Sequence, residues 1–259
     1  MRRLSAFLIV LGVCALALPG IVFAAPQVTF KAAVVPIVGF PHTGNRLGAG
    51  AAVQIEYTIS GTESRAGVPQ PLTGVNLYLP TGFRVHLGGL ATCPVQMLEM
   101  LGPHYCPAGS AAGPAGQVLA GPEPVPEEGT IESFYLPRGE LEFFAAAYSP
   151  FLVEIYTHAH FVNLAGGGGF GPEVIAEVST HDVQEPSTEK VNVKLGSAYR
   201  TGGKAHYNLT LPKKCPRGGF PIKAELKFAA RSSEQRGAAK LVLPEQTVTK
   251  LYKTACPRK

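Results

Sequence analysis

Residues 151–164 read FLVEIYTHAHFVNL, and this stretch decides how the rest of the chain can fold. Apolar and polar side chains alternate along it, which is typical of a β-strand with one buried face. One face carries Val153, Ile155, Ala159 and Phe161, and the other carries Glu154, Tyr156, His158 and His160. We therefore expect a long strand whose polar face holds two histidines.

The segments on either side of this stretch, 140–148 and 172–180, alternate in the same way, and short turns join them to it. Consecutive strands with short connections favour an antiparallel meander. If the three apolar faces share one side of a sheet, the polar side chains share the other. That register places Glu177 opposite or diagonal to one of the two histidines. It also brings Glu140 and Glu142 beside them.

Three interpretations of this polar face stay open. Histidines two residues apart can point at one ion, so His158, His160 and Glu177 are candidate ligands of zinc or a similar metal, with a position left open for hydrolytic chemistry. Oppositely charged cross-strand pairs are also ordinary sheet stabilisation, worth about 0.2–1 kcal/mol each. The carboxylates can instead dock against a basic part of the chain. No other cofactor is predicted.

Several catalytic signatures can be set aside. It contains no GxSxG and no HExxH, and Asp182 is its one aspartate. A Ser-His-Asp triad would have a single possible acid, and calcium loops draw heavily on aspartate. The sequence therefore favours a binding or structural protein over an enzyme.

Outside residues 151–164, apolar and polar side chains alternate along most of the chain too. Further strands are predicted at 27–38, 53–59, 74–79, 191–195, 205–211, 222–228 and 240–253. Residues 94–101, PVQMLEML, lack the alternation and end at Gly102-Pro103, which predicts one short helix. Thirty glycines and 23 prolines fit a turn-rich β protein. We expect an all-β protein, an antiparallel β-sandwich of one large or two packed subdomains.

Residues 1–24 have the basic start, apolar run and small-residue end of a secretory signal peptide. The run is too short to span a bilayer, and no later stretch approaches the roughly 20 apolar residues that a spanning helix needs. We therefore expect an exported protein, secreted or associated with the cell envelope, with no transmembrane segment in its mature chain.

The mature chain keeps four cysteines, namely Cys93, Cys106, Cys215 and Cys256. An even count in an oxidising compartment favours two disulfides. Three connectivities are possible for four cysteines. We expect Cys93 to pair with Cys106 and Cys215 with Cys256, because each pair lies within one structural neighbourhood.

Charge divides the mature chain into an acidic region, 25–186, and a basic region, 187–259. Residues 25–189 carry five Lys or Arg against fifteen Asp or Glu, whereas 190–259 carry sixteen against three. Such asymmetry indicates an anionic partner or docking of one region on the other. The candidate anion-binding residues stand opposite the apolar faces of the basic strands: Lys194, Lys204, Lys223 and Lys227.

Outside the cell, the anionic partner would be a cell-envelope polymer, a lipid head group or an acidic polysaccharide. Nucleic acid is not expected, because the chain carries an export signal and no nucleic-acid-binding motif. The favoured function is a secreted, non-enzymatic, envelope-associated binding or structural module that uses its basic C-terminal face.

Four sequence blocks carry a resemblance to a known group. They are LPTGF at 79–83, CPAGS at 106–110, YNLTLPKKCPRGGFPIKAELKFA at 207–229 and a closing CP at 256–257. Together they resemble uncharacterised secreted β-sandwich proteins common in actinobacteria. The resemblance covers most of the mature chain, and it implies an exported β protein without assigning any catalytic residue.

Overall fold

A computed structural model describes residues 26–60, 71–121, 127–149, 152–164, 168–178, 187–231 and 241–257. The predicted signal peptide, 1–24, lies outside these residues. Eleven of the described strands form one sheet, in which neighbours pair antiparallel. In sheet order they are β1 (Gln27–Val35), β2 (Ala52–Ser60), β10 (Ser187–Leu195), β5 (Gly116–Gly121), β6 (Glu127–Tyr135), β7 (Glu140–Ala147), β8 (Val153–Asn163), β9 (Phe170–Val178), β3 (Leu72–Pro80), β14 (Phe220–Arg231) and β15 (Leu241–Thr254).

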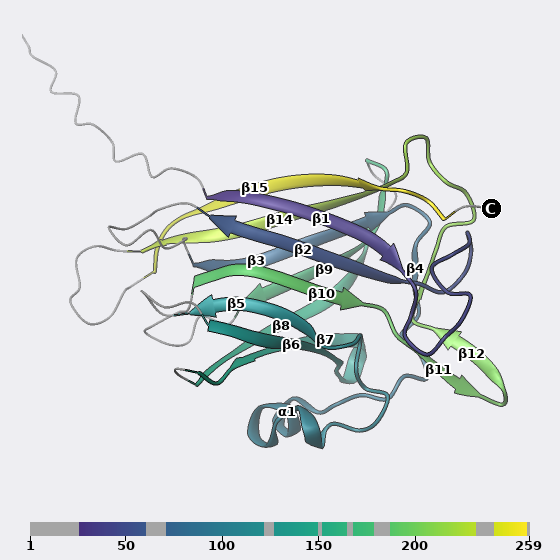
Figure 1. The fold of residues 1–259 in the computed structure, drawn as a ribbon, viewed down its shortest axis with the longest axis horizontal. Coiled ribbons are helices and arrows are strands. Elements are labelled where there is room, and N and C mark those ends of the chain that lie inside the picture. Colours follow the sequence, from purple (N-terminus) through teal and green to yellow (C-terminus); the bar gives the residue numbers. More distant parts are fainter. Residues whose placement is uncertain are drawn as a thin grey trace, which may run out of the picture.

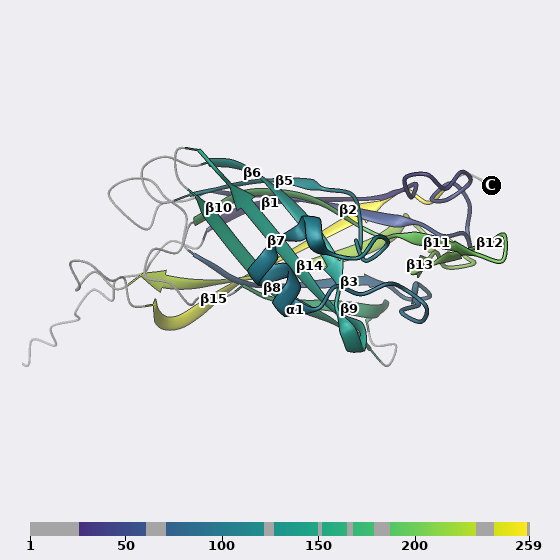
Figure 2. The same ribbon diagram turned by 90° about the horizontal axis from the view of Figure 1, so that it is seen from below.

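The sheet curls on itself until its first and last strands, β1 and β15, lie side by side (Figure 1). Seen from below, the strands of the two resulting layers run at an angle to each other (Figure 2). Apolar side chains from both layers fill the space between them, among them Val53, Leu141 and Leu226, each 0% exposed. The predicted fold class, an all-β antiparallel sandwich with one short helix, is confirmed.

The predicted central strand is β8, which lies between β7 and β9. Because β5 to β9 are consecutive in the sheet as well as in the chain, the expected antiparallel meander is confirmed. The register is also the expected one. His158 pairs with Glu142 on β7 and with Glu177 on β9, while His160 pairs with Glu140.

The strands of the basic region do not form a sheet of their own. β10 is inserted between β2 and β5, and β14 lies between β3 and β15. The boundary that we expected between 186 and 187 therefore separates two strands of one continuous sheet. The segment predicted as a strand over 205–211 is divided at Asn208 into β12 (Lys204–Tyr207) and β13 (Leu209–Thr210).

Two small sheets extend one end of the sandwich. β12 forms a hairpin with β11 (Ala198–Thr201), and β13 pairs with β4 (Arg84–Val85). Both lie at the end of the sandwich where β15 finishes (Figure 1). The disulfide between Cys215 and Cys256 joins the loop before β14 to the chain after β15, as predicted.

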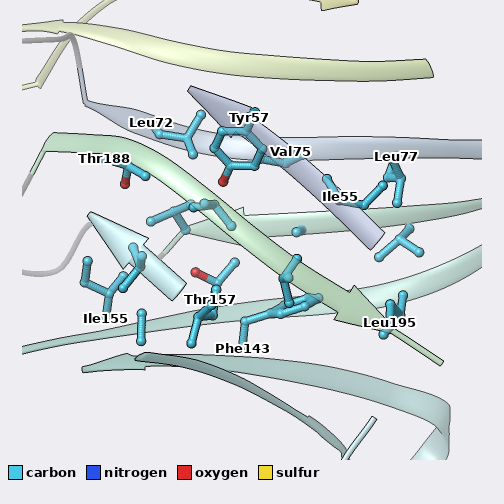
Figure 3. Close-up of a pocket in the computed structure, with 18 residues that line it drawn as sticks. Ile55, Tyr57, Leu72, Val75, Leu77, Phe143, Ile155, Thr157, Thr188 and Leu195 are labelled. Atoms are coloured by element: carbon cyan, nitrogen blue, oxygen red, sulfur yellow. The ribbon is translucent and has the colours of Figure 1, made fainter. Parts of the chain in front are cut away.

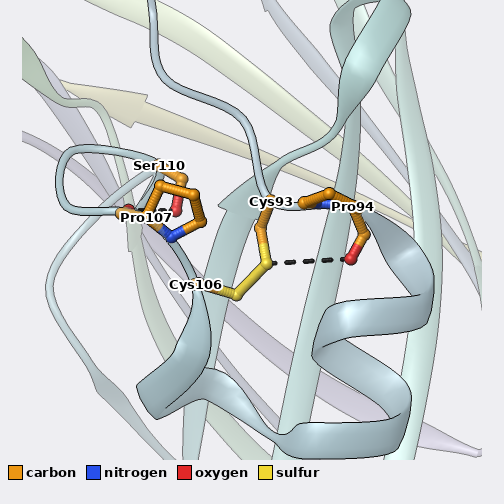
Figure 4. Close-up of a disulfide and its surroundings, with 5 residues drawn as sticks. All are labelled: Cys93, Pro94, Cys106, Pro107 and Ser110. Atoms are coloured by element: carbon orange, nitrogen blue, oxygen red, sulfur yellow. Dashed lines mark hydrogen bonds between the residues drawn. A yellow bond between two sulfur atoms is a disulfide. The ribbon is translucent and has the colours of Figure 1, made fainter.

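The helix α1 (Val95–Leu101) lies outside the sandwich, where it covers the outer face of β6, β7 and β8 (Figure 1). Leu98 is its buried side chain, and it packs with Phe134 and Phe144. The second predicted disulfide, Cys93 with Cys106, closes the segment that contains the helix (Figure 4). Seven residues are too few for a stable isolated helix, so packing and this bridge hold α1 in place.

None of the helices in the described part of the chain has the length and apolar composition of a membrane-spanning segment.

Candidate functional site

The polar face of β8 holds a histidine between carboxylates. Nδ1 of His158 lies 3.1 Å from Oε2 of Glu142, and Nε2 of the same ring lies 3.8 Å from Oε2 of Glu140. The side chain of His158 is 47% exposed, whereas that of Glu142 is 4% exposed. The imidazole therefore covers a carboxyl group that is buried beside α1.

Burial raises the pKa of the Glu142 carboxyl, and the hydrogen bond with His158 opposes this shift without cancelling it. Glu99 on α1 adds a like charge nearby, which raises the pKa further. The same outer face carries Tyr156, whose pKa burial raises to about 12. These contacts are those of an ordinary cross-strand pair on the outer face of the sheet.

The predicted metal ligands are close in register but do not converge. His158 turns toward β7, while its other cross-strand partner, Glu177, lies on β9. His160 pairs with Glu140 and with an isoleucine of β9. In the described part of the chain, no group of three or more His, Cys, Asp or Glu side chains is placed to hold a metal ion. Zinc binding by these residues stays a prediction.

Lys223, one of the four predicted anion-binding lysines, already has internal partners. Its Nζ lies 2.8 Å from Oε1 of Glu225 and 3.6 Å from the ring centre of Tyr78, a cation–π distance. Burial alone would raise the pKa of Glu225, but the hydrogen bonds that it accepts from Lys223 and Tyr78 hold the pKa below its ordinary value. The charge of this lysine is thus partly neutralised within the protein.

The other three predicted lysines lie apart from one another. Lys227 is half-buried on β14, opposite Gly74, and Lys194 is half-buried on β10, opposite Gln54. Because β10 and β14 are not neighbours in the sheet, these side chains do not form one patch. Lys204 is exposed on the hairpin β11–β12 at the end of the molecule. Their role in anion binding stays a prediction.

The structure instead gathers cations at one end of the sandwich. We call this surface the basic end, and define it as residues 36–50, 81–92, 196–219 and 252–257. Within these described segments there is no Asp or Glu. All of their Lys and Arg side chains are exposed: Arg46, Arg84, Arg200, Lys204, Lys213, Lys214, Arg217 and Lys253. No ion pair in the described part of the chain involves any of these eight residues.

Backbone hydrogen bonds hold the segments of the basic end together. Gly48 N–H donates to the carbonyl of Pro212 at 3.1 Å, and His86 N–H donates to that of Asn208 at 2.6 Å. The buried side chain of Asn208 accepts a hydrogen bond from Ser197 N–H at 2.7 Å and donates to the hydroxyl of Tyr135. The exposed cations therefore project from segments that are hydrogen-bonded to one another.

Lys204 is the one residue that these eight cations share with the four predicted anion-binding lysines, all of which were sought in the basic region. Arg46 and Arg84 belong to the acidic region, but their loops lie against residues 208–212 of the basic region. The missed signal was the absence of any acid from two whole loops, 36–50 and 81–92.

The described ion pairs among Lys, Arg, Asp and Glu do not join the acidic region to the basic region. Lys31 pairs with Glu56 within the acidic region, and Lys223 pairs with Glu225 within the basic region. They give no support to electrostatic docking of the two regions.

A cavity of about 100 Å³ lies between the two layers of the sandwich (Figure 3). Its walls come from β2, β3 and the six strands β5 to β10. Most of the lining side chains are apolar, and three carry hydroxyl groups: Tyr57, Thr157 and Thr188. Burial raises the pKa of Tyr57 far above its ordinary value. A small space lined mostly by carbon offers few polar partners to an ordered water, so it is a void in the core packing.

Comparisons with known proteins give little. No family model matches the sequence, and no curated protein matches it either. One solved structure with some similarity is the T6 backbone pilin of serotype M6 Streptococcus pyogenes, which has a modular three-domain structure decorated with variable loops and extensions. The two chains share 10% identity, and the match covers 90% of this chain and 36% of the pilin with a TM-score of 0.36. A likeness at this level says nothing about function.

Proposed function

We propose that this protein is a non-enzymatic binding module that attaches to an anionic polymer of the cell envelope through its basic end. The observation that carries the proposal is the segregation of charge. Eight exposed cations share one end of the sandwich with no carboxylate in the same segments. A surface of one charge sign attracts polyanions and speeds their association. Two disulfides support an oxidising location outside the cytosol.

The magnitudes favour several weak contacts acting together. A basic side chain near an anionic surface contributes about 1 kcal/mol, and salt screens it within a Debye length of roughly 8–10 Å. A single lysine would therefore bind no polymer measurably. Several such side chains acting at once bring the affinity into the micromolar range, and the binding falls steeply as salt rises.

The proposal is tested by charge reversal at the basic end. The variant Lys213→Glu with Lys214→Glu should bind an anionic cell-wall preparation at least about 30-fold more weakly at low salt, which corresponds to the loss of two contacts of about 1 kcal/mol each. The matched control, Lys31→Glu with Lys190→Glu, makes the same change in net charge at exposed sites outside the basic end.

Co-sedimentation at about 0.05 M and 0.5 M salt separates the outcomes, since screening weakens an electrostatic contact over this range. Loss of binding in the basic-end variant alone supports the proposal. Equal losses in both variants would show that only net charge matters. Failure of the unaltered protein to sediment with the preparation at low salt would remove the proposal.

A further inference from the structure

The basic end contains a recess whose chemistry differs from that of a plain cationic surface. It measures about 640 Å³ and opens between the hairpin β11–β12 and the loop after β4. Its walls include His86, Tyr199, His206, Tyr207 and Thr210. The volume lies within the range of small-molecule sites, and four of these five side chains are rings that can also form hydrogen bonds.

The rings of the hairpin are held in fixed positions. Tyr199 and His206 stack with their centres 4.9 Å apart and their planes 13° from parallel. The hydroxyl of Tyr199 donates a hydrogen bond to the carbonyl of Gly88 at 3.2 Å, which ties the stack to the opposite wall. His206 is exposed, so the outer face of its ring is available to a ligand.

Tyr207 is fixed by a different contact. A Cβ atom added at Gly50 would clash with the ring of Tyr207, so the ring packs directly on the glycine backbone. Phe40 meets the same ring edge-on, with centres 6.2 Å apart. Because these contacts fix the ring before any ligand arrives, binding costs little ordering of side chains.

A cation lies beside the stacked rings on the same face of the hairpin. The register pairs Tyr199 with His206 and Thr201 with Lys204. Residues two apart on a strand share a face, so Lys204 projects on the side that carries the stack. Across the recess, Nε2 of His86 lies 3.4 Å from the hydroxyl of Thr210, and both groups can also bind a ligand hydroxyl.

We propose that this recess binds one acidic sugar unit, a hexuronic acid, within an anionic polysaccharide. The C–H face of the pyranose ring would stack on the exposed imidazole of His206, as weakly polarised C–H groups do on aromatic rings. Its carboxylate would pair with Lys204, and its hydroxyls would bond with His86 and Thr210. A phosphate chain has no apolar ring face to use this stack. The inference rests on the proposed function and names the class of polymer.

The test compares two polyanions of equal charge on the full chain. Titration calorimetry would measure the affinity for a polygalacturonate oligosaccharide and for a linear polyphosphate, with the unaltered protein and with His206→Ala. We expect the protein to prefer the polyuronate. We also expect His206→Ala to weaken polyuronate binding about 10-fold, the usual cost of losing one stacking ring, and to change polyphosphate binding less than about 2-fold.

A second variant, Tyr199→Phe, keeps the stack and loses the hydroxyl, so it serves if His206→Ala proves unstable. It should weaken polyuronate binding about 3-fold by releasing the stack from Gly88. Equal affinity for the two polyanions, or equal losses for both in the His206 variant, would overturn the sugar assignment and leave the proposed function standing. Failure of both polyanions to bind would overturn the proposed function as well.

Discussion

Replacing Leu98 with alanine should cost the fold about 3 kcal/mol. Leu98 is 0% exposed, and it anchors α1 on Phe134 and Phe144. Buried Leu→Ala substitutions cost about 2–5 kcal/mol, and the cost is smallest where the surrounding structure can collapse into the space. Collapse is limited here, because the disulfide between Cys93 and Cys106 closes the segment on both sides of the helix.

Guanidinium unfolding followed by circular dichroism measures this change as a shift of the midpoint at constant slope. The control is Met100→Ala on the same helix. Met100 is 79% exposed, so its loss should change stability by less than about 0.5 kcal/mol. If Leu98→Ala also costs less than about 1 kcal/mol, the packing of Leu98 against Phe134 and Phe144 is not what holds α1 on the sheet.

Three further changes test other parts of the fold. Burial raises the pKa of Glu142, so its ionisation costs stability as pH rises through that raised value; Glu142→Gln should therefore gain in melting temperature relative to the unaltered protein between pH 4 and pH 7. Ala176 lines the core cavity, and Ala176→Val should stabilise by about 1 kcal/mol in chemical unfolding. Replacing Cys215 and Cys256 with serine should cost about 4 kcal/mol in the same assay, given a loop of 41 residues.

Each of these three has a clear contrary result. A pH-independent difference between Glu142→Gln and the unaltered protein would mean that the buried carboxyl does not titrate differently in the folded state. Ala224 is 1% exposed and does not line the cavity, so Ala224→Val should destabilise; equal effects at the two alanines would mean that the cavity is not empty space. Unchanged stability of the serine variant would mean that this bridge constrains nothing.

The meander around 151–164 was predictable because its signals are local. Alternation fixes which side chains share a face, and short turns fix which strands pair, so the placing of Glu142 and Glu177 beside the two histidines follows from the sequence, whereas the pairing of both with His158 comes from the structure. The places of β10 and β14 do not follow. Their partners lie far away in the chain, and several strands offer a similar apolar face.

The sequence predicted a cationic surface, but it did not predict all of the residues that form it or where it lies on the molecule. Counting charges identified a cationic surface, and it named Lys204, which lies in the basic end. Counting also named Lys223, although Glu225 lies two residues along the same strand face and pairs with it. Such a pair is visible in the sequence once the two-residue period of a strand is applied to opposite charges. The recess was not predictable, because its walls include Gly88 and Tyr199, which lie 111 residues apart in the chain.

The insertion of β10 between β2 and β5 has a consequence for the order of assembly. β2 is complete at Ser60, yet the strand that covers its second edge begins at Ser187. β3 likewise pairs with β14, which begins at Phe220. Contacts this distant in the chain slow folding, and strand edges stay open to other chains meanwhile. We therefore expect a slow folder that needs its C-terminal residues before its N-terminal strands are protected.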